Sequence, residues 1–158
     1  MARNAAQAPP LEETVHVGLS ASASLTVTDS DTAMSLRSGD VPVLATPRLV
    51  ALCEEATCRA LDDRLGSGRT SVASRVRFDH LVPVPVGSTV TAEATLEKVE
   101  GRRLIFTITV TLDSDDRAAL VAAGRITRVV VERLAFLAKA RCPEVATDLP
   151  TGGAAGRT

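Results

Sequence analysis

The sequence predicts an α+β domain in which a five-stranded antiparallel sheet wraps around one long helix. Three observations support this expectation. One segment with strand-like alternation precedes a segment with helical periodicity, and four more alternating segments follow it. The helical segment has a wide apolar arc and a narrow polar one, so strands have to cover most of it. The turns between the later strands are short, which makes those strands antiparallel neighbours.

The length of 158 residues and the hydrophobic content of 45% fit one domain with a core of its own. We expect this domain over residues 15–141. Residues 1–14 and 142–158 are expected to be flexible tails, because the two ends of the chain are rich in Ala, Pro, Gly and Thr.

In the first half of the chain we expect a strand over 16–28, an irregular stretch over 29–45 with a helical turn near 32–36, and a long helix over 46–65. Thr46 is expected to be the N-cap of this helix and Pro47 its first helical residue, since a hydroxyl and a proline are favoured at those positions. The glycines at Gly66 and Gly68 then end the helix.

In the second half we expect strands over 70–82, 88–99, 102–112 and 117–131, and a short helix over 132–140. The inward-facing residues of the first three of these strands are expected to be Val72, Ser74, Val76, Phe78 and His80, then Val90, Ala92, Ala94 and Leu96, then Leu104, Phe106, Ile108 and Val110. The dipeptide Glu100-Gly101 predicts a hairpin turn.

Composition excludes several classes of function. Aromatic residues make up 2% of the chain, without Trp or Tyr, and the net charge is −1, so a nucleic-acid surface is not expected. No apolar run reaches the roughly 20 residues of a membrane helix, and the N-terminus lacks a signal-peptide pattern. The three cysteines show no metal-binding spacing, and we expect no metal, no cofactor and a reducing, cytoplasmic setting.

Glu54 is the most informative residue, because it falls where a carboxylate is costly. At about 100° per residue, it shares one side of the long helix with apolar residues. These are Val50, Cys58, Leu61 and Leu65. Its neighbour Glu55 falls on the charged side. We therefore expect Glu54 to be buried, which requires pairing or protonation and is most often tolerated at a working site.

The segments 43–61 and 70–110 resemble the fluoroacetyl-CoA thioesterase family of the hotdog superfamily. The residues that carry the resemblance are Ala45-Thr46, Val50-Ala51-Leu52-Cys53-Glu54, Ala60, His80, Gly87, the segment 88–93, the segment 99–104, Arg128 and Phe136. The spacing is the specific part: Thr46, then Glu54 eight residues later, then His80 after 26 more. The similarity spans roughly residues 15–140.

This resemblance implies a homodimeric hotdog enzyme that hydrolyses acyl-CoA thioesters at the subunit interface. It implies that Thr46, Glu54 and His80 are catalytic and that Arg128 and Ala73 bind substrate. Glu54 would act as nucleophile or as general base, with His80 moving a proton or steadying its charge. Each residue also has a structural alternative: Glu54 as a buried carboxylate bonded to backbone or to Arg128, His80 as a core histidine, and Thr46 as a helix cap.

One departure from the family concerns the acyl group. The family has Phe residues in the loop before the catalytic Thr, whereas this chain has Arg37 and Asp40 at the matching positions. We expect the 29–45 segment to form a polar lid and the acyl pocket to be aliphatic. Two other functions remain open at this stage: a hotdog module that binds acyl-CoA or another apolar ligand without turnover, and, with less support, a dehydratase.

Overall fold

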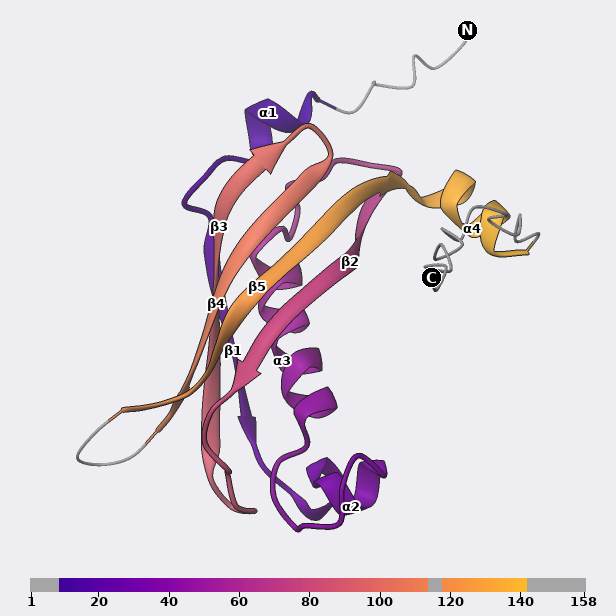
Figure 1. The fold of residues 1–158 in the computed structure, drawn as a ribbon. Coiled ribbons are helices and arrows are strands. Elements are labelled where there is room, and N and C mark those ends of the chain that lie inside the picture. The colour runs from indigo at the N-terminus through magenta and orange to yellow at the C-terminus, as the bar shows by residue number, and fades with distance from the viewer. Residues whose placement is uncertain (1–8, 114–117, 142–158) are drawn as a thin grey trace, which may run out of the picture.

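The computed structural model describes residues 9–113 and 118–141 and contains one antiparallel sheet in the order β1-β3-β4-β5-β2 (Figure 1). The elements are α1 (Leu11–Thr14), β1 (Ser20–Thr26), the 3-10 turn η1 (Asp29–Asp31), α2 (Ala33–Leu36), α3 (Thr46–Ala60), β2 (Arg69–His80), β3 (Thr89–Glu100), β4 (Arg103–Leu112), β5 (Ala119–Glu132) and α4 (Arg133–Arg141). Each element predicted from the sequence is present, and the predicted hotdog architecture is confirmed.

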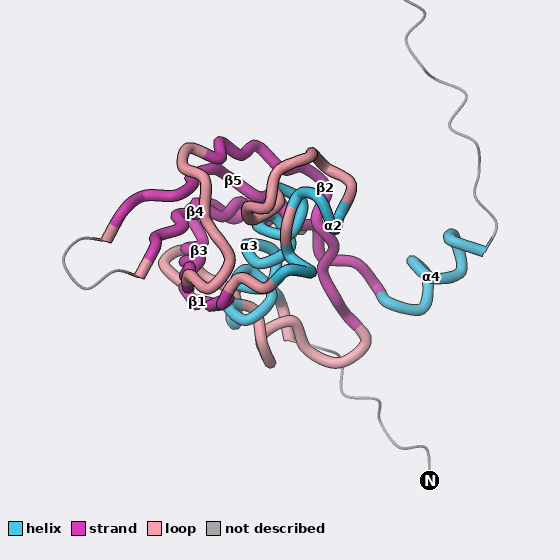
Figure 2. Tube along the Cα trace, turned by 90° about the horizontal axis from the view of Figure 1, so that it is seen from below, coloured by secondary structure: helices cyan, strands magenta, loops and turns pink. Residues whose placement is uncertain are grey.

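The sheet curls around α3, which lies in its concave face (Figures 1 and 2). The concave face is aliphatic: every predicted inward residue of β3 and β4 is 0% exposed. The face of α3 that packs against it is formed by Leu49, Leu52, Cys53, Ala56 and Ala60. The small side chains at the last three positions let the helix lie close to the strands. Since burial of apolar area is the main stabilising term, this contact holds the fold together.

β2 departs from the predicted alternation at one point. A shift in its pairing with β5 falls between Ala73 and Arg75, so the strand carries a bulge at Ser74. The prediction was right for Val76, Phe78 and His80, which follow the bulge. It was wrong for the residues before the bulge, because one extra residue moves the inward positions to Ala73 and Ser71. Ala73 thus pairs with Arg128 and packs against the core.

The long helix is shorter than predicted. α3 ends at Ala60, and residues 61–64 continue as tight turns in which Leu61 N–H bonds to the Cys58 carbonyl and Arg64 N–H to the Leu61 carbonyl. These turns carry Leu61 into the core, where it is 4% exposed. The apolar period continues through them, which is why the pattern alone overestimates the helix.

The two ends of the described chain differ in their contact with the core. α1 lies ahead of the predicted domain start at residue 15, and its Leu11 packs against the core. The predicted C-terminal helix is present as α4, which stands away from the sheet and has no buried residue (Figures 1 and 2). Residues 1–8 and 142–158, where most of the predicted tails fall, lie outside the described residues.

Close contact between β5 and β2 depends on Gly124, which pairs with Phe78. A Cβ atom at this position would lie 2.1 Å from the carbonyl oxygen of Arg77. We expect Gly124→Ala to lower the free energy of unfolding by about 1–3 kcal/mol, because the strands have to separate. Gly39→Ala is the control, since its new methyl meets only the Ala33 Cβ at 3.3 Å. Equal urea midpoints for the two variants would contradict this account.

Candidate functional site

Thr46 and His80 are in direct contact, although 34 residues separate them in the chain. The Oγ1 atom of Thr46 lies 2.9 Å from Nδ1 of His80. Ala45, not Thr46, is the N-cap of α3, and no side chain caps the helix there. The prediction that Thr46 caps the helix was therefore wrong: Thr46 is its first residue, and its hydroxyl is engaged by the histidine.

His80 is the last residue of β2 and pairs with Ala122 of β5. Its side chain is half-buried, and its Nε2 atom is buried without a hydrogen-bond partner among the described residues. When Thr46 donates to Nδ1, Nε2 carries the ring proton; when Nδ1–H donates to Thr46, Nε2 has a free lone pair. In either tautomer Nε2 has no hydrogen-bond partner among the described residues.

A cavity of about 400 Å³, here called the Thr46–His80 cavity, surrounds this pair. Its lining is mostly small and aliphatic: Ala33, Ser38, Gly39, Val41, Val43, Leu44, Ala45, Thr46, Pro47, His80, Leu81, Val82 and Pro83. Arg37 and Asp40 are exposed and do not line it. The segment 29–45 thus contributes Ser38 together with apolar residues to the cavity lining, whereas the charged Arg37 and Asp40, which were expected in a polar lid, lie outside it.

Glu54 is half-buried, not buried as predicted. The centre of the packed face of α3 lies near Cys53 and Ala56, and Glu54 falls at the border of that face beside Val50 and the exposed Cys58. The helical arithmetic correctly grouped these residues, but they form the side of α3 that the sheet leaves uncovered. Glu55 is exposed, as predicted, and forms an ion pair with Arg59.

Glu54 does not join the Thr46–His80 pair within one chain. Eight residues of helix separate it from Thr46, a rise of about 12 Å. Among residues 9–113 and 118–141, its carboxylate accepts no hydrogen bond. The structure thus brings two of the three predicted catalytic residues together and places the third two turns further along α3.

Arg128 is 5% exposed and projects from β5 toward α3. Its guanidinium donates to the Ser71 hydroxyl at 2.8 Å, the Ser71 carbonyl at 2.8 Å and the Thr57 hydroxyl at 3.2 Å. The alternative in which Arg128 pairs with Glu54 was wrong: all three acceptors are neutral. A buried cation with only neutral partners is costly. Ala73, the other predicted substrate contact, pairs with Arg128.

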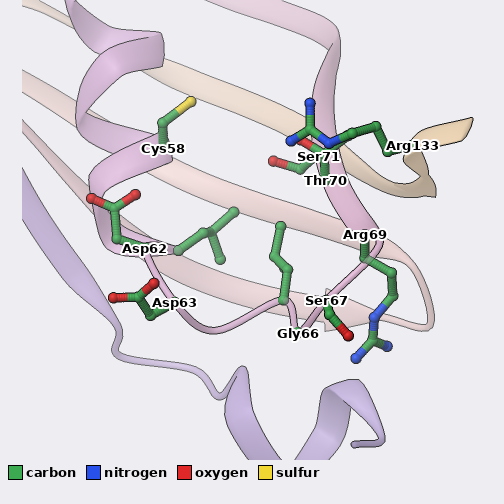
Figure 3. Close-up of a pocket in the computed structure, with 11 residues that line it drawn as sticks. Cys58, Asp62, Asp63, Gly66, Ser67, Arg69, Thr70, Ser71 and Arg133 are labelled. Carbon is green, nitrogen blue, oxygen red and sulfur yellow. The ribbon is translucent and has the colours of Figure 1, made fainter. Parts of the chain in front are cut away.

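A second cavity, of about 550 Å³, lies between the end of α3 and the start of β2 and is here called the α3–β2 cavity. Figure 3 shows Cys58 and Arg133 projecting into it from opposite sides, with Ser71 beside Arg133. The two cavities are therefore at opposite ends of β2, one near His80 and one near Arg69.

Asp31, which was not among the residues predicted from the sequence, is 8% exposed. Burial would raise the pKa of this carboxyl, but hydrogen bonds from the Thr28 backbone and side chain and from Arg48 outweigh burial and hold its pKa below the ordinary value. The signal in the sequence was the spacing of Thr28 and Asp31, which is typical of a reciprocal N-terminal cap, and the structure contains that cap.

The described part of the chain contains no group of three His, Cys, Asp or Glu side chains placed to hold a metal ion. No described helix is long and apolar enough to cross a membrane. Burial, followed by the nearby charge of Glu54, raises the pKa of the Cys53 thiol to about 12, which leaves it protonated and unreactive.

Comparison with known proteins gives a consistent result. Residues 27–134 match the model of a family described as fluoroacetyl-CoA-specific thioesterase. The chain is 34% identical over 99 residues to the fluoroacetyl-CoA thioesterase of Streptantibioticus cattleyicolor, covering 63% of this chain and 68% of that protein.

Solved structures agree with the family match. A variant of the fluoroacetyl-CoA enzyme in complex with acetyl-CoA superposes with a TM-score of 0.72 at 28% identity, covering 80% of this chain and 97% of the other. A thioesterase superfamily member from Thermus thermophilus superposes with a TM-score of 0.72 at 27% identity, covering 80% and 90% of the two chains.

Thr46→Val tests what the Thr46 hydroxyl does. We expect the variant to lose about 1 kcal/mol of unfolding free energy, because His80 Nδ1 loses its partner. In a His80→Ala background the same change should cost almost nothing. Thr46→Ser keeps the hydroxyl and is the control. If urea unfolding shows that Thr46→Val lowers the unfolding free energy equally in wild-type and His80→Ala protein, the hydroxyl stabilises the helix start and not the histidine.

Proposed function

Because the chain belongs to the fluoroacetyl-CoA-specific thioesterase family and is a thioester hydrolase, we propose that it cleaves small or medium acyl-CoA thioesters in a site built from two subunits. The observation that carries this proposal is the Thr46–His80 pair, with an unpartnered Nε2, at an aliphatic cavity. The cavity suits a short hydrocarbon chain, since each buried methylene contributes about 0.8 kcal/mol.

Glu54 supplies the attack in this proposal. As a nucleophile, its carboxylate adds to the thioester carbonyl, and CoA leaves as a thiolate that takes a proton from protonated His80. Water then hydrolyses the mixed anhydride to the free acid and the Glu54 carboxylate, and the proton released in this step returns to His80. As a general base, Glu54 takes a proton from the water that attacks the carbonyl directly, and this proton passes to the departing CoA thiolate. Both routes consume one water and release one carboxylic acid and CoA.

Thr46 and the start of α3 stabilise the developing oxyanion. Backbone N–H groups in the first turn of a helix have no partner within the helix and carry a partial positive charge. Thr46 lies in that first turn and lines the same cavity as His80. An oxyanion placed there would meet these donors where negative charge develops.

A homodimer would bring Glu54 to the pair. β2 is an edge strand 12 residues long, and its inward residue Val76 is 39% exposed. An exposed edge of this length is usually paired or covered. Two copies of β2 pairing antiparallel about a two-fold axis would set the His80 end of one strand beside the Arg69 end of the other.

Antiparallel pairing of two β2 strands would explain why the proposed site residues lie at two ends of β2 in each chain. Each chain holds Thr46 and His80 at one end of β2, and Ala73 and Arg128 toward the other. The uncovered side of α3, with Glu54, faces away from its own sheet. In the dimer, the histidine of one subunit meets the carboxylate and the arginine of its partner, and no single chain holds a complete site.

Thiol release from a panel of acyl-CoAs tests which acyl group the enzyme prefers. We expect butyryl- or hexanoyl-CoA to be preferred to acetyl-CoA, because the lining of the Thr46–His80 cavity is aliphatic. The kcat/KM for fluoroacetyl-CoA should exceed that for acetyl-CoA only slightly, since no Phe, Tyr or Trp side chain lines the Thr46–His80 cavity to exclude water. A preference for fluoroacetyl-CoA of 10³-fold, about 4 kcal/mol in the transition state, would contradict this assignment. No turnover of any acyl-CoA would favour ligand binding without catalysis.

Glu54 and Glu55 are adjacent on α3, so substitutions at these two positions test whether Glu54 is the attacking group. Glu54→Gln should reduce kcat/KM on the order of 10²-fold or more, as expected for loss of a nucleophile or base. Glu55→Gln should leave activity nearly unchanged, because Glu55 is exposed and pairs with Arg59. Equal effects of the two changes would remove Glu54 from the mechanism.

Mixed dimers test whether the site is shared. His80→Ala and Glu54→Gln chains, each inactive as homodimers, are co-expressed with two different tags and purified through both. One of the two sites in the mixed dimer would then hold an intact His80 and an intact Glu54, so about half of the wild-type kcat should return. If the mixed species stays inactive, both residues serve the same chain's site. Light scattering should give twice the chain mass of 16.5 kDa.

A further inference from the structure

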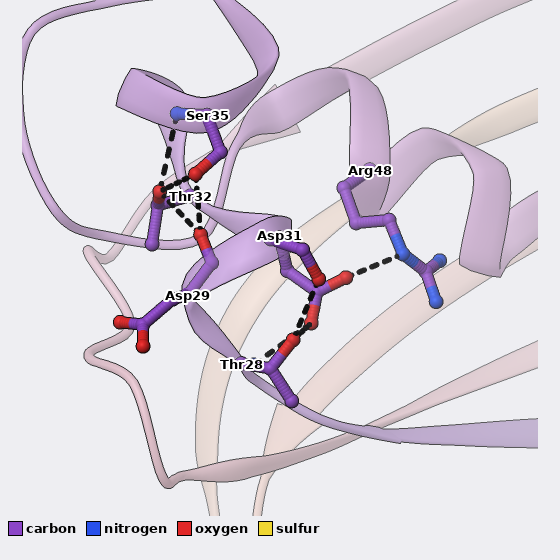
Figure 4. Close-up of polar contacts among 7 residues, drawn as sticks. Thr28, Asp29, Asp31, Thr32, Ser35 and Arg48 are labelled. Carbon is purple, nitrogen blue, oxygen red and sulfur yellow. Dashed lines mark hydrogen bonds and ion pairs between the residues drawn. The ribbon is translucent and has the colours of Figure 1, made fainter.

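Asp31 is a buried charged group that takes no part in the proposed chemistry. One carboxylate oxygen accepts from Thr28 N–H at 2.8 Å and from the Thr28 hydroxyl at 2.8 Å, and the other accepts from Arg48 Nε at 2.9 Å (Figure 4). Hydrogen bonds to a charged group are among the stronger ones in proteins. The carboxylate therefore joins Thr28, just after β1, to the first turn of α3.

The main chain of Asp31 makes a second connection to α3. Its carbonyl oxygen accepts from Ala45 N–H at 2.9 Å. Ala45 is the N-cap of α3, and Arg48 lies in the first turn. Thr46 stands between them, so Asp31 holds the chain on both sides of the residue that contacts His80.

The first turn of α3 needs such support. Helix ends are usually stabilised by a capping side chain, and without one they fray. Ala45 has no side chain that can cap, and the Thr46 hydroxyl is engaged by His80. A negative charge close to a helix N-terminus is also favourable, because it complements the helix dipole.

We propose that Asp31 is a positioning residue, which holds the first turn of α3 through Arg48 and Ala45 so that the Thr46 hydroxyl meets Nδ1 of His80. The kinetic part of this inference rests on the proposed function, whereas the geometric part does not. Asp31 contacts neither member of the pair in the described structure and acts only through the Arg48 side chain and the Ala45 backbone.

The first test is NMR of the histidine rings. The chain has two histidines, so the ring signals are readily assigned. Asp31→Asn turns one acceptor oxygen into a donor that faces Thr28 or Arg48, and we expect it to shift the His80 signals while those of His16 stay in place. Asp29→Asn, two residues away on an exposed side chain, should shift neither. Unchanged His80 signals in folded Asp31→Asn protein would overturn the proposal, whether or not the protein has activity.

The second test is kinetic. Asp31→Asn and Arg48→Met should each lower kcat about tenfold with KM changed less than twofold, and the two together should lower it little more than either alone. In a Thr46→Val background, Asp31→Asn should lower kcat by less than twofold, because Asp31 acts through Thr46. These kcat values are measured well below the melting temperature. If Asp31→Asn lowers kcat tenfold both in the wild type and in the Thr46→Val variant, Asp31 does not act through Thr46. Absence of turnover in the wild type would contradict the proposed function and leave the NMR test to decide on Asp31.

Discussion

Burial of one face of α3 in the concave face of the sheet determines where every residue of the site lies. Cys53, Ala56 and Ala60 are small enough for the helix to approach the strands closely, and Gly124 lets β5 and β2 do the same. With that face fixed, the start of α3 meets the end of β2, which places Thr46 at His80. The same contact leaves the side of the helix that carries Glu54 uncovered by the sheet.

The Thr46 hydroxyl bonds His80 and does not cap α3. A hydroxyl at a helix start commonly caps the helix and is worth about 1 kcal/mol there. In this protein the hydroxyl is bonded to His80 instead, and α3 has no side-chain cap. The helix start is connected to Asp31 through Ala45 and Arg48. Stability is thus supplied by a neighbouring element, and the hydroxyl is free for another role.

Charge at the middle of α3 is arranged in a related way. Arg128 is buried with only neutral acceptors, one of which is the Thr57 hydroxyl. The same hydroxyl donates to the backbone carbonyl of Glu54 at 2.6 Å. Arg128 is thus connected through Thr57 to the backbone of Glu54, and it forms no ion pair with the Glu54 side chain among the described residues.

The sequence alone determined the order of the elements, the concave faces of β3 and β4, and the residue types at the site. These follow from local alternation and from the helical period, which depend only on neighbours in the chain. It also predicted Thr46, Glu54 and His80 as a catalytic group, a role that stays a prediction. Only the tertiary structure decided that the Thr46 hydroxyl bonds His80, that Arg128 binds Ser71 and Thr57, and that Glu54 is half-buried. Helical arithmetic orders residues around an axis but does not show which side the sheet will cover. In the same way, the bulge at Ser74 arises from pairing with β5, and it exchanged the inward and outward residues of the first part of β2.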